Sequence, residues 1–242
     1  MYFGFEGAIR AVVIGARGGL GEALCARLQA AGADVWGTSR DRAWVSEDPE
    51  RRVYVDLCDE QSLEDLVDRV ADPELRLVIN ATGLLHDGRV SPERTWRTLQ
   101  VEQLNQVFAV QTVGVALLIK HLMPQLPRRG RAVFANISAR VASIGDNRLG
   151  GWYSYRASKA AGNMLMKCAA LEAKRSHRGL LCVALHPGTV DTDLSRPFSA
   201  RVPPHKLFTA DQSAAYLDEV VSGLTAADSG TFWAWDGQPI PW

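Results

Sequence analysis

The length and the charge balance of the chain already exclude several classes of protein. Its 242 residues suit one large α/β domain, and a hydrophobic share of 47% is ample for a substantial core. Lysine plus arginine and aspartate plus glutamate number 27 each, so no net field recruits nucleic acid or an anionic membrane, and we expect the bound partner to be a small molecule.

A glycine-rich turn joins the first predicted strand to the first predicted helix. Residues 11–14 are an uninterrupted apolar run, the turn follows as Gly15-Ala-Arg-Gly-Gly-Leu-Gly21, and 22–31 has helical composition. Glycines let the backbone pass close to a pyrophosphate, and the helix presents free N–H groups and the positive end of its dipole. The arrangement predicts a phosphate-binding site for a dinucleotide.

The second predicted strand, 34–38, ends in Ser39 and Arg40. An acidic residue here would accept hydrogen bonds from the adenosine ribose, whereas an arginine suits a 2′-phosphate. We therefore predict NADP(H) rather than NAD(H) as the cofactor. Arg17, inside the glycine turn, can supply a second positive charge, although a solvated surface role is the alternative for each arginine.

The rest of the chain alternates between strands and helices. After a polar segment at 41–52, predicted as a surface loop, we expect strands at 53–55, 75–79, 131–137 and 180–185, an edge strand at 231–235, and helices at 60–71, 107–123, 155–174 and 211–224. The strands are mostly apolar throughout, which is typical of a parallel sheet buried on both faces. The predicted fold class is α/β, with one domain over residues 1–242 built as a doubly wound, mostly parallel sheet with helices on both faces. The helix at 107–123 is apolar nearly all round, so we expect a second subunit of a homodimer or homotetramer to cover its outer side.

Tyr155 and Lys159 stand four residues apart where the helix after the fifth strand begins. This spacing puts both side chains on one helix face, about one turn apart. A phenol is a poor acid at neutral pH, with a reference pKa of about 10, but a neighbouring ammonium favours the phenolate, so the pair could donate or accept a proton. Tyr153 lacks this partner because Ala157 lies four residues after it. An exposed helical pair is the alternative interpretation.

Four motifs, in this order, resemble those of the short-chain dehydrogenase/reductase family: the glycine turn, Asn80-Ala-Thr-Gly83, Tyr155-x-x-x-Lys159 and Pro187-Gly188. The resemblance covers essentially the whole chain. The connection at 138–155 and a short substrate loop at 193–207 resemble the carbonyl-reductase and C-factor-like branch. The resemblance implies a Rossmann-type fold that binds NADP(H) and transfers hydride between nicotinamide and a carbonyl or alcohol substrate.

The resemblance also implies roles for single residues. Tyr155 would exchange a proton with the substrate, and Lys159 would hold the nicotinamide ribose and lower the pKa of the tyrosine. Asp56 and Leu57 would hold the adenine. The predicted cofactor-binding residues, in chain order, are Gly15, Arg17, Gly19, Leu20, Gly21, Ser39, Arg40, Asp56, Leu57, Asn80, Ala81, Gly83, Tyr155, Lys159, Pro187, Gly188, Val190 and Thr192.

Two positions depart from the family pattern. The family serine that orients the carbonyl is usually the second of a pair, where this chain has Ala139 after Ser138. Ser138 is the nearest candidate for that role and Ser143 the alternative, and an ordinary turn hydroxyl is the competing interpretation of either. In the helix before the fifth strand, the family asparagine is replaced by Gln111, whose amide lies one methylene further out. Gln111 is the candidate catalytic residue that could still support a water-linked proton path, and loss of that path is the alternative. Asn105, six residues earlier, faces the opposite side of that helix and does not substitute for it.

Histidine and cysteine positions give no sign of a metal site. The five histidines show no ligand spacing with each other or with cysteine, and the four cysteines contain no CxxC pair, which suits buried, reduced thiols and a cytoplasmic protein. Neither a secretion signal nor a membrane span is predicted.

An apolar substrate pocket is predicted at the carboxyl ends of the strands. Its expected wall consists of Leu84, Leu85, His86, Trp152, Leu194 and Phe198. The leading hypothesis is an NADP(H)-dependent oxidoreductase of the carbonyl-reductase type. The alternative is an NADP(H)-binding regulatory or signalling protein with weak or no catalysis, which the replacements at positions 139 and 111 keep open. A third possibility is an interaction protein with a vestigial cofactor site.

Overall fold

The apolar runs of the sequence form the strands of one parallel sheet in the computed structural model, which describes residues 2–242. The strands are β1 (Arg10–Ile14), β2 (Asp34–Ser39), β3 (Arg52–Tyr54), β4 (Leu75–Asn80), β5 (Ala132–Ile137), β6 (Leu180–His186) and β9 (Thr231–Ala234). Their spatial order is β3-β2-β1-β4-β5-β6-β9. The direction of winding reverses between β1 and β4, so a ligand crevice is expected at the carboxyl ends of these two strands. The predicted doubly wound Rossmann-type fold is confirmed.

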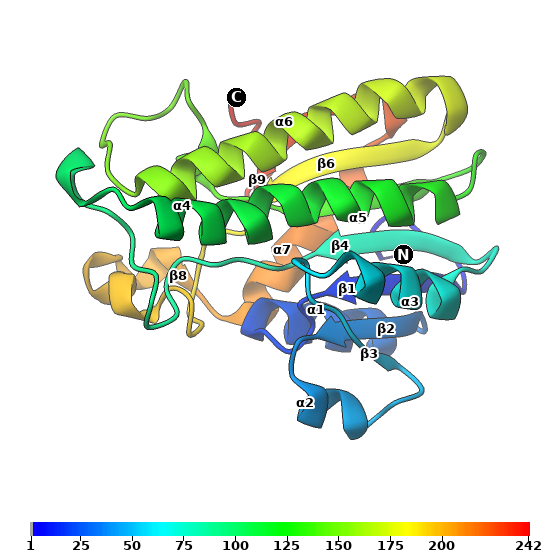
Figure 1. Ribbon diagram of the computed structural model, residues 1–242. Coiled ribbons are helices and arrows are strands. Elements are labelled where there is room, and N and C mark those ends of the chain that lie inside the picture. The colour runs from blue at the N-terminus through cyan, green and yellow to red at the C-terminus, as the bar shows by residue number, and fades with distance from the viewer. Residues whose placement is uncertain (1) are drawn as a thin grey trace.

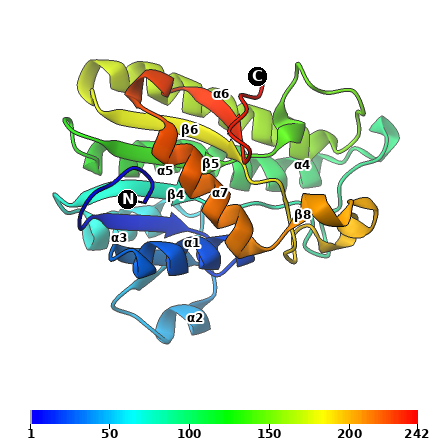
Figure 2. The same ribbon diagram turned by 180° about the vertical axis from the view of Figure 1, so that it is seen from behind.

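Helices cover both faces of the sheet because alternate residues along each strand point to opposite sides. Val12 and Val78 belong to the core under α3 (Glu60–Val70), α5 (Gly114–Leu122) and α6 (Tyr153–Ser176), which lie together in Figure 1. Val13 and Ile79 belong to the core under α1 (Gly19–Ala30) and α7 (Ala210–Gly223), which cover the opposite face in Figure 2. Both faces of the strands are therefore buried, as their apolar composition predicted.

The long apolar helix is interrupted in its middle. Helix α4 (Val101–Phe108) continues through a π-helical turn at Ala109–Val113 into α5, so the helix begins six residues before the predicted start. By length and composition alone the segment Val101–Gln125 could cross a membrane, with a mean hydropathy of 1.5. In this fold it packs beside α6 and against the sheet (Figure 1), and its residue Val113 is exposed to solvent.

Two segments predicted as irregular contain regular structure. The predicted loop at 41–52 includes the short helix α2 (Arg42–Ser46), because the Asp41 carboxylate accepts the N–H groups of Ala43 and Trp44 and so caps its first turn. The predicted loop at 193–207 contains 3₁₀ turns, and the strand β8 (Leu207–Phe208) at its end pairs with β7 (Thr189–Val190). These elements hold the segment that follows β6 close to the carboxyl edge of the sheet.

Candidate active site

The glycine turn lies at the carboxyl end of β1, where the chain is too crowded for side chains. Gly15 has a φ of 82°, and a Cβ on Gly21 would lie 2.2 Å from the Gly15 carbonyl oxygen. A Cβ on Gly19 would lie 2.8 Å from Thr192 Cγ2, while Leu20 packs on the core. Helix α1 begins here without a side-chain cap, so its first-turn N–H groups can face an anion. The turn has the features that a pyrophosphate requires.

The predicted adenosine phosphate residues gather at the end of β2. Ser39 Oγ accepts the N–H of Asp41 at 3.0 Å, and Arg17 Nε lies 2.9 Å from Asp41 Oδ2. Arg17 is thus brought to the corner where β2 ends, with its charge balanced by a carboxylate. Arg40 is exposed and forms no ion pair with any residue between 2 and 242. Its guanidinium is available to a phosphate.

The predicted adenine residues follow β3. The Asp56 carboxylate accepts the N–H of Cys58 at 3.0 Å, and its backbone is bonded in both directions by Ser62 Oγ. Leu57 is buried, and a Cβ on Gly114 would lie 2.7 Å from its Cβ. Because this side chain belongs to the core, only the backbone of Leu57 can face an adenine.

Hydrogen bonds fix the turn after β4. Asn80 Nδ2 donates to Asn136 Oδ1 of β5 at 2.8 Å, and Asn80 Oδ1 accepts the hydroxyl of Thr82 at 2.7 Å. Ala81 N–H donates to Ile14 O of β1 at 2.9 Å. The amide of Asn80 is therefore satisfied by the protein, and it shapes the crevice by holding the ends of β1, β4 and β5 together.

Gly83 lies where the predicted catalytic groups converge. A Cβ at this position would lie 3.4 Å from Leu194, 3.8 Å from Gln111 Oε1 and 3.9 Å from Lys159 Nζ. These residues come from the segment after β7, the π-helical turn and α6. The absence of a side chain at Gly83 keeps open the space beside the lysine.

Tyr155 and Lys159 lie on the buried face of α6. Lys159 Nζ donates to Ile137 O at 2.8 Å and to Thr82 O at 3.2 Å. Burial lowers the pKa of Lys159 to about 8 and raises the pKa of Tyr155 to about 12. This direction for the tyrosine pKa is opposite to the one expected from a neighbouring ammonium, and its cause is the removal of the phenol from solvent.

The side chain of Gln111 is buried in the π-helical turn and fully engaged. Its Nε2 donates to Ser158 Oγ at 2.8 Å, and its Oε1 accepts the N–H of Leu84 at 3.3 Å. Ser158 Oγ in turn donates to the carbonyl oxygen of Tyr155 at 3.0 Å. Sequence reasoning missed Ser158, although its place three residues after Tyr155 put it on the same face of the helix. Asn105 is exposed and takes no part, as expected.

The two candidate serines have different surroundings. Ser138 is 3% exposed, and its Oγ has no hydrogen-bond partner among the described residues. Ser143 Oγ donates to Pro241 O and accepts the N–H of Asp146 at 3.1 Å. Ser143 therefore fixes a turn against the C-terminal segment, whereas the hydroxyl of Ser138 is free to meet a ligand. Ala139 offers none.

The segment after β6 forms the other end of the crevice. Pro187 O accepts Ser213 Oγ of α7 at 2.8 Å. Gly188 has a φ of 78°, and a Cβ there would lie 2.5 Å from Phe208 Cε2, so no other residue fits. Val190 lies buried on β7. These predicted cofactor-binding residues, which the family resemblance places at the nicotinamide end, are thus held at the sheet edge by α7 and β8.

Aromatic rings gather beside Tyr155, among the residues predicted to form the substrate pocket. Trp152 meets Tyr155 edge to face at 6.1 Å between ring centroids, and Phe198 at 5.1 Å. His86 lies 5.6 Å from Phe198, and its Nε2 is hydrogen-bonded to the carbonyl oxygens of Asp193 and Leu194. We call Trp152, Tyr155, His86 and Phe198 the aromatic cup. Of the other predicted pocket residues, Leu84 and Leu85 are buried, and Leu84 packs with the core under α4.

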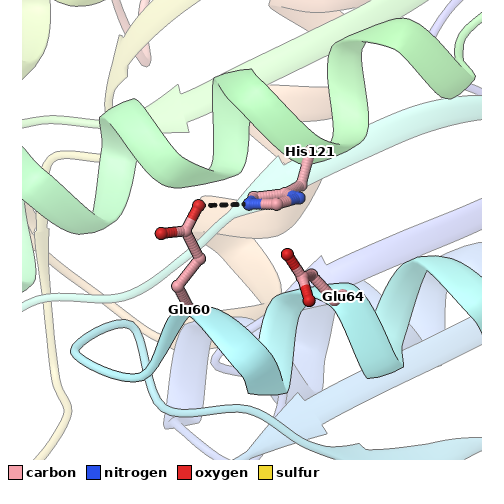
Figure 3. Close-up of side chains that lie close together, drawn as sticks. All are labelled: Glu60, Glu64 and His121. Atoms are coloured by element: carbon pink, nitrogen blue, oxygen red, sulfur yellow. Dashed lines mark hydrogen bonds and ion pairs between the residues drawn. The ribbon is translucent and has the colours of Figure 1, made fainter.

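A separate cluster of possible metal ligands lies between α3 and α5 (Figure 3). Ligand atoms of Glu60, Glu64 and His121 lie within 4.8 Å of one another. However, Glu60 Oε1 is bonded to Lys120 Nζ at 2.5 Å and to His121 Nε2 at 2.8 Å. The ammonium balances Glu60, so this cluster serves as an ion-pair network that joins two helices. The spacing of histidines and cysteines in the sequence did not predict this cluster, because its other two members, Glu60 and Glu64, are glutamates of a different helix.

Comparisons with known proteins agree with this geometry. A sequence profile described as short chain dehydrogenase matches residues 10–202. The chain is 29% identical over 239 residues to 1-hydroxy-2-glutathionyl-2-methyl-3-butene dehydrogenase of Rhodococcus sp. (strain AD45), covering 96% of this chain and 98% of that one. It is 31% identical over 137 residues to the C-signal protein of Myxococcus xanthus, covering 57% of this chain and 77% of that one.

A solved structure has the same fold as this chain. The carbonyl reductase from chicken fatty liver, solved with NADPH bound, superimposes with a TM-score of 0.80 at 27% identity, covering 97% of this chain and 100% of that one.

Proposed function

Because the chain belongs to the short-chain dehydrogenase/reductase family, we propose that it is an NADP(H)-dependent oxidoreductase that interconverts a carbonyl compound and an alcohol. The observation that carries the proposal is that Tyr155 and Lys159 lie on one buried face of α6, with the lysine ammonium beside Gly83 at the carboxyl end of β4. The crowded glycine turn and the uncommitted Arg40 support an NADP(H) site along the same sheet edge. The chicken carbonyl reductase of the same fold was solved with NADPH.

Each of the chain's own residues at the site would have a separate chemical role. The bound nicotinamide supplies the hydride donor or acceptor. Tyr155 Oη gives a proton to the carbonyl oxygen in reduction, or takes it from the alcohol in oxidation. The ammonium of Lys159, with a pKa of about 8, keeps positive charge beside that oxygen at neutral pH. The free Ser138 hydroxyl orients the carbonyl by donating a hydrogen bond, and Gln111 holds α6 in register through Ser158.

The proposed substrate is a small carbonyl or alcohol compound that packs against the aromatic cup. We also propose that the protein is cytoplasmic and assembles as a homodimer or homotetramer. Exposed apolar residues of the π-helical turn and of α6 support the assembly, since Val113, Met164 and Leu171 are each more than half exposed.

A regulatory or signalling protein with weak catalysis is the second candidate. Ala139 in place of the expected serine favours it, and so does the similarity to a protein named C-signal. NADPH oxidation measured against a panel of aldehydes and ketones separates the two, because NADPH binding without turnover on any compound supports the regulatory role.

Tyr155→Phe tests the proposed chemistry directly. We expect this variant to lose turnover by about 10³-fold or more while its NADPH dissociation constant stays within about twofold, because only the transferable proton is removed. Tyr153→Phe is the matched control, since it removes a neighbouring phenol from the same helix turn and should retain activity. Retained turnover in Tyr155→Phe would contradict the mechanism.

A further inference from the structure

The helix that carries Tyr155 and Lys159 begins without a cap of its own. Its N-cap residue, Trp152, has φ 52° and ψ 44°, a left-handed conformation that is uncommon for a bulky residue, and no side chain of the helix caps it. The first N–H groups of an α-helix need acceptors from outside the helix. Because Trp152 also contacts Tyr155, whatever fixes this helix start bears on the position of the phenol.

Glu93, which lies about 60 residues earlier in the chain, supplies the missing acceptors. Its backbone oxygen accepts the N–H of Trp152 at 2.5 Å, and its Oε2 accepts the N–H of Ser154 at 3.2 Å. Gln103 of α4 donates to Glu93 Oε1 at 2.5 Å and holds the carboxylate from the other side. A side chain far away in sequence therefore takes the place of a capping residue.

The carboxylate of Glu93 is buried without a cation. The residue is 3% exposed, and it forms no ion pair with any residue of the described chain. Burial raises the pKa of Glu93, but hydrogen bonds from Ser154 and Gln103 outweigh this and hold it below its usual value. The positive end of the α6 dipole stabilises the charge further. An unpaired buried charge usually destabilises a folded protein, but at the start of α6 the hydrogen bonds and the helix dipole offset this cost.

Trp152 transmits the position of the helix start to the site. Its ring lies between Tyr155 and Phe198, so it contacts both the proposed proton donor and the segment that closes the aromatic cup. Arg156 reinforces the same corner, since its Nε donates to Gly151 O at 3.0 Å. A change in the capping contacts would therefore move the tryptophan, the phenol and the wall of the cup together.

We propose that Glu93 is a positioning residue that caps α6, holds Trp152 in its left-handed conformation and thereby sets the place of the Tyr155 hydroxyl relative to the bound carbonyl. The proposal rests on the proposed function for its kinetic consequence, whereas the capping contact stands by itself. In this proposal Glu93 acts together with Tyr155 and Lys159, although it contacts neither substrate nor cofactor.

The test compares Glu93→Ala and Glu93→Gln with the wild-type protein. Glutamine retains an oxygen that can accept the Ser154 N–H, so it separates the geometry of the contact from its charge. Glu172→Ala is the matched control, because Glu172 is an exposed glutamate on α6, the helix that Glu93 caps. For each protein we would measure kcat and KM for the best carbonyl substrate of the panel, the NADPH dissociation constant, and amide hydrogen exchange at Ser154 and Tyr155.

In Glu93→Ala we expect kcat to fall by about tenfold or more and KM for the carbonyl to rise, because small misplacements of a reacting group are costly. The NADPH dissociation constant should change by less than about twofold, because Glu93 contacts none of the predicted cofactor residues outside α6. Exchange at Ser154 should become faster. Glu93→Gln should restore kcat to within about threefold of the wild type.

Wild-type kcat and KM in Glu93→Ala would overturn the proposal. So would a loss of activity matched by an equal loss of NADPH affinity without rescue by glutamine, since that pattern indicates general damage. If the wild-type protein reduces no carbonyl compound, the proposed function fails. The capping role of Glu93 is then tested by hydrogen exchange alone. Faster exchange at Ser154 in Glu93→Ala supports the capping role, and unchanged exchange refutes it.

Discussion

The side-chain amide nitrogen of Gln111 lies 2.8 Å from Ser158 Oγ, and this short link joins the π-helical turn to the helix that carries the proposed catalytic pair. The glutamine reaches Ser158 and the Leu84 N–H at the same time. Both contacts are buried, so losing them leaves polar groups without partners. Glutamine has one methylene more than the asparagine expected from the family pattern. This extra length therefore lets the amide reach both partners.

Gln111→Asn should lower the free energy of unfolding by about 1–3 kcal/mol, because the shorter amide cannot keep both buried hydrogen bonds. Urea unfolding measures this change. Asn105→Ala, at an exposed site on the same helical segment, should change stability by less than about 0.5 kcal/mol. A Gln111→Asn variant as stable as the wild type would show that the longer side chain is not required.

The serines at 138 and 143 should respond in opposite ways to removal of their hydroxyls. Ser138→Ala should leave stability nearly unchanged, because no hydrogen bond within the protein is lost, but should lower kcat by about 10–100-fold if the hydroxyl orients the carbonyl. Ser143→Ala should lower the free energy of unfolding by about 1–3 kcal/mol, because it removes contacts with Pro241 and Asp146. Parallel kinetics and urea unfolding check both effects, and the reverse pattern would assign the orienting role to Ser143.

Arg40→Ala should weaken NADPH binding by about 10–100-fold while leaving NADH binding nearly unchanged, because only NADPH carries the 2′-phosphate. Titration with both cofactors measures the difference. Arg17→Ala should have the smaller effect, since Asp41 already balances that guanidinium. Equal weakening for both cofactors in Arg40→Ala would place the arginine away from the 2′-phosphate.

Lys159→Met should make the protein inactive and yet more stable at neutral pH. Burial lowers the pKa of Lys159 from 10.5 to about 8, so below pH 8 the folded chain bears the full cost of a buried ammonium, about 3 kcal/mol at most before its two hydrogen bonds are counted. Between pH 8 and 10.5 the folded lysine loses its proton while the unfolded one keeps it, and the cost fades. The stability gain of Lys159→Met should therefore be larger at pH 7 than at pH 10 in denaturant unfolding. A gain that does not depend on pH would show that burial of the charge is not its source.

The sheet and the glycine turn could be predicted because their signals are local. Apolar runs followed by Gly15 or Asn80 place the strands and their carboxyl ends directly in the sequence. The four-residue spacing of Tyr155 and Lys159 likewise predicts one helix face. Helix α2 escaped prediction because its start depends on the single cap Asp41 in an otherwise polar stretch.

Features that depend on contacts between distant residues could not be predicted. Glu93 reads as an ordinary charged residue of a loop, and only the fold brings it to the start of α6. The spacing of Tyr155 and Lys159 predicts a lowered pKa for the tyrosine, but burial by the sheet and the loops reverses the direction. The sequence left Ser143 open as the alternative to Ser138, and the contact of Ser143 with the C-terminal Pro241 distinguishes the two.

The close approach of Thr192 to Gly19 has a consequence for how cofactor binding and substrate binding would affect each other. The segment that begins at Thr192 also carries Phe198, so it rests on the glycine turn at one end and on the aromatic cup at the other. A dinucleotide bound at the glycine turn and a substrate that packs against Phe198 would contact the same short stretch of chain. Their affinities should therefore be linked, and linkage is reciprocal, so each should alter the binding of the other by the same factor.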